Sequence, residues 1–583
     1  MKDTSSACSV CSFILRSTLT PTSDPTKTVF WRSEWPNNSE DRLDCYVNVG
    51  STIMSGVHIT LLENTLTPSR DKFRYGRLVK PGCIDIQTIK DWRSNCRQYH
   101  DQACLQTESE PDLPPLSAEI RASFRLIDVK EKTVIPASPD TDYVALSYVW
   151  GQPKPERSFR QAFLDPLPTD LYQAHSLTLN MEEIPRTIRD AIDVVERLGE
   201  SYLWVDALCI SQDDVSHKMQ MIGIMDRIYR QATLTIIAAG GNSSDSGLGG
   251  LRPGSRNFEQ VVGTICGQRM IKLFPRVGGL LGASPWASRA WTYQEQHFSK
   301  FRLIFVGDRA FYQCPSAKDW SEDVTEYVHK DRISRIPSKV DYASWWPFDA
   351  VSNYNNHVEE YTRRQLSFPD DILNAFSGFI QEHSRAHHTE FYWGLPMRDF
   401  TSALLWIEKW HGPKASRPYW LKSDRPGLQR RSPISDKGFM LPSWSWAGWE
   451  GHVHFPFLSA PGYAPWDIDW EWKSNNALSE NGVITCTSEL AELEPHSIDT
   501  SHSALRTDDG SLWTQGKNLF VLLATFSQPM EYIEGAENVE PRNNIVMMLQ
   551  SRDKDKFYRK GLMVCADAQW KAAEPKTRTI ILA

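Results

Sequence analysis

Two groups of cysteine and histidine residues have the spacing of metal ligands. One is Cys8-x-x-Cys11, and the other is Cys96-x-x-x-His100-x-x-x-Cys104. Residues four positions apart lie on one face of a helix, so the second group can converge on a single ion. Thiolate and imidazole are ligands that Zn²⁺ prefers, and the two groups together offer five candidates for a structural zinc. Buried free thiols are the alternative, because the groups lie far apart in the sequence.

Two acidic residues occupy positions that suit a catalytic carboxylate. Asp206 closes a short apolar segment, and active-site carboxylates commonly follow the strands of a parallel sheet. Glu295 lies in an expected helix that can face the same sheet edge. Structural interpretations remain open for both, because Asp206 can cap the turn that begins at Ala207 and Glu295 can pair with Arg289.

Three further residues are candidates for substrate binding. Trp150 precedes Gly151 after an apolar segment, and its indole can present an aromatic face to a nucleobase. A core tryptophan before a glycine turn is the alternative. Arg289 can clamp a phosphate through two parallel hydrogen bonds, or it can take part in a structural ion pair.

An alternation of strands and helices is expected to position these residues. Apolar and β-branched runs predict buried strands at 144–148, 202–205 and 234–239, and a β-hairpin at 124–135. Residues at helical spacing predict one helix that begins near Pro185 and ends at Gly199, and a second around 219–229. This order favours an α/β fold with a parallel sheet and helical crossovers. Ligands bind such sheets beyond the carboxyl ends of the strands, where the candidate residues are expected.

Composition and charge restrict the class of protein. The 583 residues are 40% hydrophobic and 23% charged, as in folded proteins, and the length predicts two or more domains. With 64 Lys plus Arg against 72 Asp plus Glu, the net charge of −8 argues against nucleic-acid binding. No apolar run has the length of a signal peptide core or a membrane span. Eleven thinly spread cysteines indicate free thiols, so we expect a cytoplasmic protein.

Three sequence blocks stand out between residues 143 and 295. The first reads YVALSYVWG at 143–151, and the last reads RAWTYQE at 289–295. The central block runs from IPRTIRDAI at 184–192 through YLWVDALCISQDD at 202–214 and on to 238. In this order and spacing the blocks resemble the heterokaryon incompatibility (HET) domain family of filamentous fungi. Ala290 stands where the family usually has Gly, and Val205 where it often has Ile.

The resemblance implies an effector of fungal non-self recognition, in which HET domains trigger growth arrest or programmed cell death. The family has also been likened, remotely, to the TIR domains of innate immunity, some of which cleave NAD. That analogy implies a TIR-like or flavodoxin-like sheet. It also implies Glu295 and Asp206 as catalytic residues for NAD, with Trp150, Gly151 and Arg289 binding the substrate.

A non-enzymatic signalling module of the same family is the alternative function. In that case the chain would bind protein partners of non-self recognition or associate with itself, and a tryptophan-rich C-terminal region would contribute to recognition. We expect three regions: a Cys/His-containing segment and linker at 1–116, a HET region at 117–308 with its motif core at 143–295, and a mixed α+β, tryptophan-rich region at 309–583. Motifs of P-loop nucleotidases, Ser hydrolases and HExxH metalloproteases are absent from the sequence.

Overall fold

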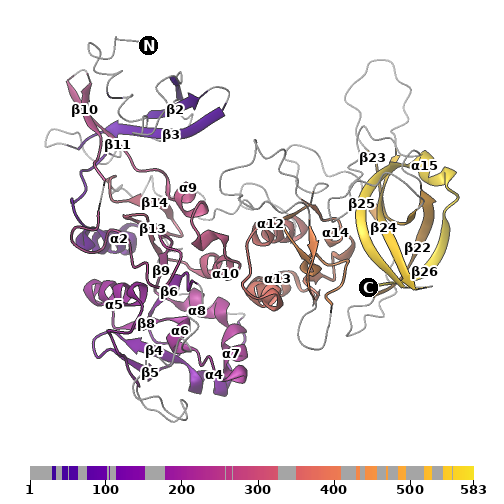
Figure 1. Cartoon of the computed structure of the whole chain (residues 1–583), viewed down its shortest axis with the longest axis horizontal. Coiled ribbons are helices and arrows are strands. Elements are labelled where there is room, and N and C mark those ends of the chain that lie inside the picture. Colours follow the sequence, from indigo (N-terminus) through magenta and orange to yellow (C-terminus); the bar gives the residue numbers. More distant parts are fainter. Residues whose placement is uncertain are drawn as a thin grey trace. The chain divides into compact units, whose positions relative to one another are not determined.

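The computed structural model of the chain contains two compact units (Figure 1). The first comprises Met1–Ala287 and Glu295–Asp341, and the second comprises Ser288–Gln294 and Tyr342–Ala583. The structure describes residues 13, 29–34, 43–49, 52–63, 75–100, 104, 113–151, 177–256, 258–265, 267–325, 350–408, 428–432, 440–455, 468–470, 484–493, 518–527, 542–553 and 556–583.

The first unit is built around a nine-stranded mixed sheet in the order β14-β13-β12-β9-β6-β8-β4-β5-β7. The four central strands, β12, β9, β6 and β8, are parallel, and the remaining strands join antiparallel on both sides. The strands are β4 Arg125–Asp128, β5 Thr133–Pro136, β6 Val144–Tyr148, β7 Leu177–Thr178, β8 Tyr202–Trp204, β9 Leu234–Ala238, β12 Arg302–Val306, β13 Arg309–Cys314 and β14 Ala317–Ser321.

Continuous apolar runs explain the centre of this sheet. Every residue of β6 and β9 is buried, as expected for parallel strands covered on both faces. In Figure 1 helices α2 and α5 lie on one side of the sheet, and α8 and α9 lie on the other. The helices of this unit are α2 Ile86–Tyr99, α4 Ala118–Ser123, α5 Arg186–Leu198, α6 Asp206–Cys209, α7 Val215–Ile222, α8 Met225–Gln231 and α9 Val277–Gly282. The short 3₁₀ helix η1 Trp286–Ser288 follows, and α10 Trp291–Phe298 contains the boundary with the second unit.

Helix α5 illustrates how local sequence sets the element bounds. Pro185 immediately precedes the helix, where its fixed φ favours a helical start. Gly199 ends it with a φ of +85°, a left-handed conformation that glycine adopts without strain. The buried side chains of Ile188, Ile192 and Val195 recur at helical spacing, so this face packs toward the core.

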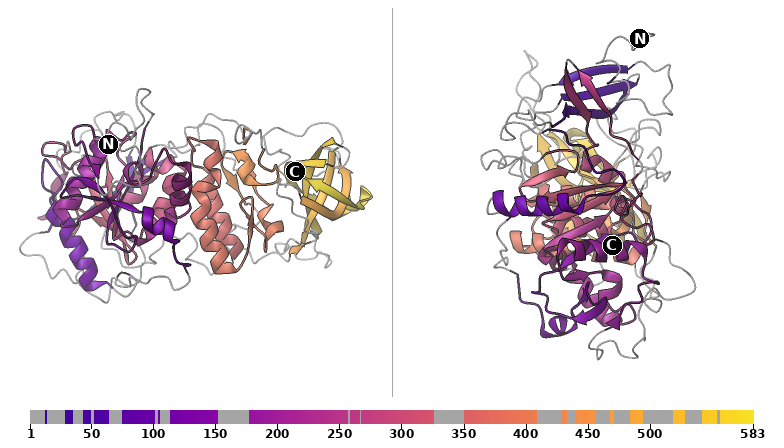
Figure 2. Two further views of the ribbon diagram at one scale, coloured as in Figure 1. Left: turned by 90° about the horizontal axis from the view of Figure 1, so that it is seen from below. Right: turned by 90° about the vertical axis from the view of Figure 1, so that its left-hand side faces the viewer.

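A smaller five-stranded antiparallel sheet also belongs to the first unit. Its order is β1-β2-β3-β11-β10, with β1 Val29–Glu34, β2 Leu43–Val49, β3 Thr52–Leu61, β10 Val262–Ile265 and β11 Gln268–Lys272. Segments far apart in the sequence therefore lie side by side, as the mixed indigo and magenta strands in Figures 1 and 2 show.

The second unit combines a helical part with a β-barrel. The helices are α12 Ala350–Thr362, α13 Ser377–His387 and α14 Phe400–Ala403. The pairing of β23 with β24 closes the barrel, drawn in orange and yellow in Figure 1. Its elements are β21 Ile468–Trp470, β22 Ile484–Leu493, β23 Asn518–Ser527, β24 Arg542–Asp553, β25 Lys556–Ala566, α15 Asp567–Ala572 and β26 Lys576–Leu582.

Several tryptophans of the second unit form its core. Trp406, Trp444 and Trp446 are each 0% exposed. The indole of Trp446 donates a hydrogen bond of 2.8 Å to the Tyr354 hydroxyl, and that of Trp406 donates one of 3.0 Å to the Trp444 carbonyl. These three tryptophans therefore stabilise the fold, and our expectation that the tryptophan-rich region recognises a partner does not apply to them.

The sheet differs from the sequence expectation in one respect. The predicted strands β6, β8 and β9 are present and parallel, and the predicted hairpin is β4–β5. The antiparallel flanks make the sheet mixed, however, so the first unit has a mixed α/β fold. No helix among the described residues is both long and apolar enough to cross a lipid bilayer.

Candidate functional site

A buried hydrogen-bond network surrounds Glu295. This residue lies on α10 and is 6% exposed. The Ser147 hydroxyl, at the end of β6, donates a hydrogen bond to Glu295 Oε2. The indole Nε1 of Trp286 donates to the same hydroxyl oxygen at 2.7 Å. Residues of strand β6, η1 and α10 therefore meet in one hydrogen-bond network around the Glu295 carboxylate.

The Asp206 carboxylate accepts two hydrogen bonds just after the end of β8. Asp206 is the first residue of α6, and its Oδ1 accepts a hydrogen bond of 2.7 Å from the backbone N–H of Ala207. Its Oδ2 accepts one of 3.0 Å from Trp150 Nε1. Val205 is the N-cap residue of α6 and no side chain caps this helix, so the Asp206 carboxylate instead binds the N–H of its neighbour and fixes the half-buried indole of Trp150.

Tyr229 has a buried hydroxyl that is influenced by the charges of both carboxylates. Burial raises its pKa well above the ordinary value, and the negative charges of Glu295 and Asp206 raise it further. Its hydroxyl donates to the Leu146 carbonyl at 3.3 Å, and its ring packs edge-on against Trp204, with 5.7 Å between the ring centroids. The phenol therefore stays protonated, with its hydroxyl donating to the Leu146 carbonyl.

The turn after β6 packs closely against the loop after β9. Gly151 has a φ of +84°, and a Cβ on this residue would lie 2.8 Å from the Cβ of Ser243. The backbone N–H of Ser244 donates to the Trp150 carbonyl at 3.2 Å. Glycine is required at 151 for both its conformation and this close approach.

Asp190 anchors the same glycine-rich loop from α5. Its carboxylate, 3% exposed, accepts the Leu248 N–H at 3.0 Å and pairs with Arg252 at 2.6 Å. The loop is closed against the β12–β13 turn, because a Cβ at Gly249 would lie 1.7 Å from the Gly307 carbonyl oxygen. These contacts fix the position of the loop that follows β9.

The predicted residues are divided between the two units of the chain. Trp150, Gly151, Asp206 and Glu295 belong to the first unit, whereas Arg289 belongs to the second. The Arg289 carbonyl accepts hydrogen bonds from the Thr292 hydroxyl at 2.8 Å and the Arg364 guanidinium at 3.3 Å.

Ser147, Tyr229 and Trp286 are the additional members of the group. A lone serine inside the apolar block YVALSYVWG was the available signal for Ser147, because a buried hydroxyl requires a hydrogen-bond partner.

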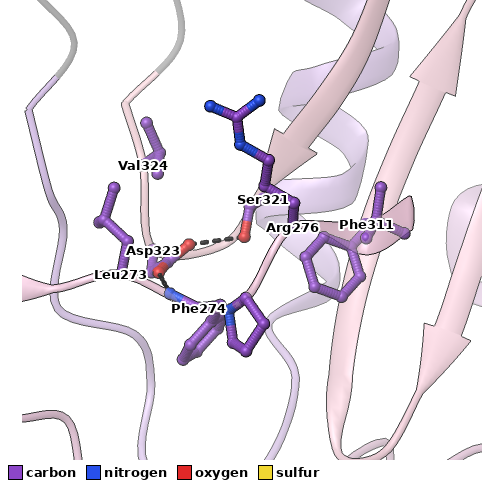
Figure 3. Close-up of a pocket in the computed structure, with 9 residues that line it drawn as sticks. Leu273, Phe274, Arg276, Phe311, Ser321, Asp323 and Val324 are labelled. Atoms are coloured by element: carbon purple, nitrogen blue, oxygen red, sulfur yellow. Dashed lines mark hydrogen bonds between the residues drawn. The ribbon is translucent and has the colours of Figure 1, made fainter. Parts of the chain in front are cut away.

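A surface pocket of the first unit lies elsewhere. It is lined by Phe274, Arg276, Phe311 and Asp323, among others, and by none of the predicted site residues (Figure 3). Asp323 is 1% exposed and accepts hydrogen bonds from the Phe274 N–H and, at 2.5 Å, from the Ser321 hydroxyl. This carboxylate holds the β11–α9 connection against the end of β14.

The predicted metal ligands are brought together in part. The side-chain ligand atoms of Cys96, His100, Cys104 and Cys314 all lie within 4.8 Å of one another. Cys8 and Cys11 lie outside the described residues. Sequence spacing could not reveal Cys314, since 214 positions separate it from His100.

The three thiols of this group influence one another strongly. Hydrogen bonds from Cys314 and Cys96 lower the pKa of the Cys104 thiol. The reciprocal hydrogen bond to Cys104 raises the pKa of Cys96 to about 12 and also raises that of Cys314. One thiolate is therefore favoured at Cys104, where the other two thiols donate to it.

Comparison with known proteins agrees with the three sequence blocks. Residues 143–295 match the model of the family described as Heterokaryon incompatibility protein (HET). A curated relative, Heterokaryon incompatibility protein 6, OR allele, of Neurospora crassa, is 30% identical over 119 residues, which cover 19% of this chain and 16% of that protein. No solved structure matches the chain significantly. The matched segment contains the whole group around Glu295 and Asp206, and residues 143–295 of this chain are a HET domain.

Proposed function

We propose that this protein acts in fungal heterokaryon incompatibility, as a cytoplasmic effector that stops growth or kills the cell after contact with a non-self partner. The match of residues 143–295 to the HET family carries this proposal. The name of the Neurospora crassa relative supports it, although the aligned segment covers 16% of that protein.

The strand order supports a flavodoxin-like, and hence TIR-like, interpretation of the domain. The central parallel strands lie in the order β8-β6-β9-β12, which is 2-1-3-4 in chain order. In flavodoxin-like sheets this order places a topological switch point between the first and third strands, and ligands bind outside their carboxyl ends. Here those strands are β6 and β9, and Ser147 and Trp150 lie at the end of β6.

We further propose that this edge cleaves the nicotinamide–ribose bond of NAD. In this reaction nicotinamide leaves with the electron pair of the C–N bond, water adds to the ribose carbon, and the water's proton is released. The Glu295 carboxylate would stabilise the positive charge that develops on the ribose. Asp206 would position the ribose hydroxyls or the attacking water, and Trp150 would contact a base. The charges of both carboxylates raise the pKa of Tyr229, which supports placing the two groups in one site.

The burial of Glu295 sets a condition on this chemistry. At 6% exposure and with Ser147 hydrogen-bonded to it, the carboxylate cannot meet a substrate unless the strand-end edge opens. Partner binding or self-association would supply that opening. The same observation favours a second candidate function, a non-enzymatic signalling module in which Glu295 is structural.

Expression of the full chain in a filamentous fungus tests the proposed role. The matched variants are Glu295→Gln and Glu196→Gln, since Glu196 is an exposed residue of α5 that pairs with Lys132. We expect growth arrest with the parent and with Glu196→Gln, and normal growth with Glu295→Gln at equal protein level. Normal growth in all three would contradict the effector role, and arrest in all three would favour the non-enzymatic module.

A further inference from the structure

Four side chains from two stretches far apart in the sequence of the first unit converge where the end of helix α2 meets the end of strand β13. Cys96 lies in the last turn of α2, His100 is the C-cap residue of that helix, and Cys104 follows four positions later. Cys314 is the last residue of β13. Their ligand atoms lie within 4.8 Å of one another.

The separations match a tetrahedral metal site. Tetrahedral zinc with Zn–S bonds of about 2.3 Å and Zn–N bonds of about 2.0 Å places neighbouring ligand atoms about 3.5–3.8 Å apart. His100 Nδ1 lies 3.2 Å from Cys314 Sγ and 3.4 Å from Cys104 Sγ. These two separations are close to the tetrahedral values, and no pair of ligand atoms in the group exceeds them by more than about 1 Å.

The surroundings of the group are those of a closed structural site. Cys96, His100 and Cys314 are buried, and Trp320 packs edge-on against the His100 ring with 5.3 Å between the ring centroids. The Ser316 hydroxyl lies 3.3 Å from Cys104 Sγ, where it can donate to a thiolate. The group contains no carboxylate, so it does not suit hard cations such as Ca²⁺ or Mg²⁺.

We propose that Cys96, His100, Cys104 and Cys314 bind one structural Zn²⁺ ion. Three thiolates and one imidazole complete the four-coordinate shell, which leaves no open position for a catalytic water. This set replaces the five ligands that the sequence suggested, because Cys314 supplies the fourth position. Cys8 and Cys11 are therefore not required.

The position of the ion gives it a specific role. Helix α2 precedes the HET segment, and β13 follows it, so the ion joins the two flanks of residues 143–295. A link between positions 214 residues apart closes a very long loop, and such links restrict the unfolded chain strongly. The zinc would stabilise the whole first unit, independently of any activity at Glu295.

Metal analysis of the purified full chain, with single substitutions, tests this assignment. We expect about one zinc per parent chain. Cys314→Ser should reduce the content to a small fraction of that, whereas Cys83→Ser should retain it, because Cys83 is a half-buried free thiol outside the group. The double variant Cys8→Ser/Cys11→Ser should also retain the metal. Full zinc retention by Cys314→Ser, or loss in the Cys8/Cys11 variant, would overturn the ligand set.

A measurement on the parent protein keeps the test independent of variants that fail to fold. Protein reconstituted with Co²⁺ should show the intense visible absorption of tetrahedral cobalt together with thiolate-to-metal charge-transfer bands. Ser316→Ala should weaken metal affinity about 10-fold, in line with other groups that support a ligand through a hydrogen bond. Parent protein purified with zinc present that contains no zinc, binds no Co²⁺ and titrates all its thiols as free would refute the proposal.

Discussion

Replacing Ser147 with alanine removes the centre of the hydrogen-bond network around Glu295. The serine hydroxyl donates to the Glu295 carboxylate and accepts from Trp286 Nε1 at 2.7 Å, and it is 1% exposed. A hydrogen bond to a charged group contributes about 1.5–3 kcal/mol, and withdrawing an acceptor from a buried N–H costs about 1–3 kcal/mol. Because one hydroxyl makes both bonds, the two losses overlap, and we expect Ser147→Ala to lower the free energy of unfolding by about 3 kcal/mol.

Urea unfolding followed by tryptophan fluorescence measures this loss, since Trp286 lies in the network. Ser138→Ala is the control, because Ser138 is exposed and surface substitutions usually change stability by less than about 0.5 kcal/mol. Glu295→Gln keeps an acceptor for the Ser147 hydroxyl and should destabilise less than Ser147→Ala. A loss below about 1 kcal/mol for Ser147→Ala would show that the network does not hold Glu295 as described.

Three further changes test other parts of the structure, each by equilibrium unfolding. Gly249→Ala should lower the free energy of unfolding by about 3 kcal/mol, because its Cβ would lie 1.7 Å from the Gly307 carbonyl oxygen. The control is Gly278→Ala in helix α9, whose Cβ would meet nothing within 4 Å and which should be neutral or stabilising. Equal effects of the two substitutions would refute the close packing. Arg256→Met should cost about 3–5 kcal/mol, because it leaves the Glu322 carboxyl without its cation in a site where both side chains are at most 3% exposed. A loss under about 1 kcal/mol would contradict this. Burial, aided by the charge of His387, lowers the pKa of His383 to about 4. The free energy of unfolding of the second unit should therefore fall by up to about 3 kcal/mol as the pH drops from 6.5 to 4, and His383→Phe should abolish this dependence. A parent protein whose stability does not change over this pH range would argue against a buried neutral histidine.

The elements that the sequence predicted are those with local causes. Strands β6 and β9 follow from continuous apolar and β-branched runs, and α5 follows from Pro185, Gly199 and a helical apolar face. The pairing of β4 with β8 in the flank of the sheet and the pairing of β22 with β26 in the barrel join segments far apart in the sequence, which local patterns do not encode.

The candidate site shows the same division. Trp150, Asp206 and Glu295 could be proposed from strand ends and sequence blocks, but the contact between Ser147 and Glu295 joins residues 148 positions apart. Cys314 is equally remote from His100 in sequence. Trp406, Trp444 and Trp446 lie in the core rather than on a recognition surface, and composition does not reveal that the indoles of Trp406 and Trp446 donate to partners inside a core.

Nicotinamide release from NAD by the purified full chain, with and without forced clustering, tests the central claim about the HET domain most directly. The proposal predicts release by the parent and by Glu196→Gln, and none by a folded Glu295→Gln variant. Equal release by all three would place the chemistry elsewhere. No release by the clustered parent would contradict the assigned reaction and leave Glu295 as a structural carboxylate of a signalling module.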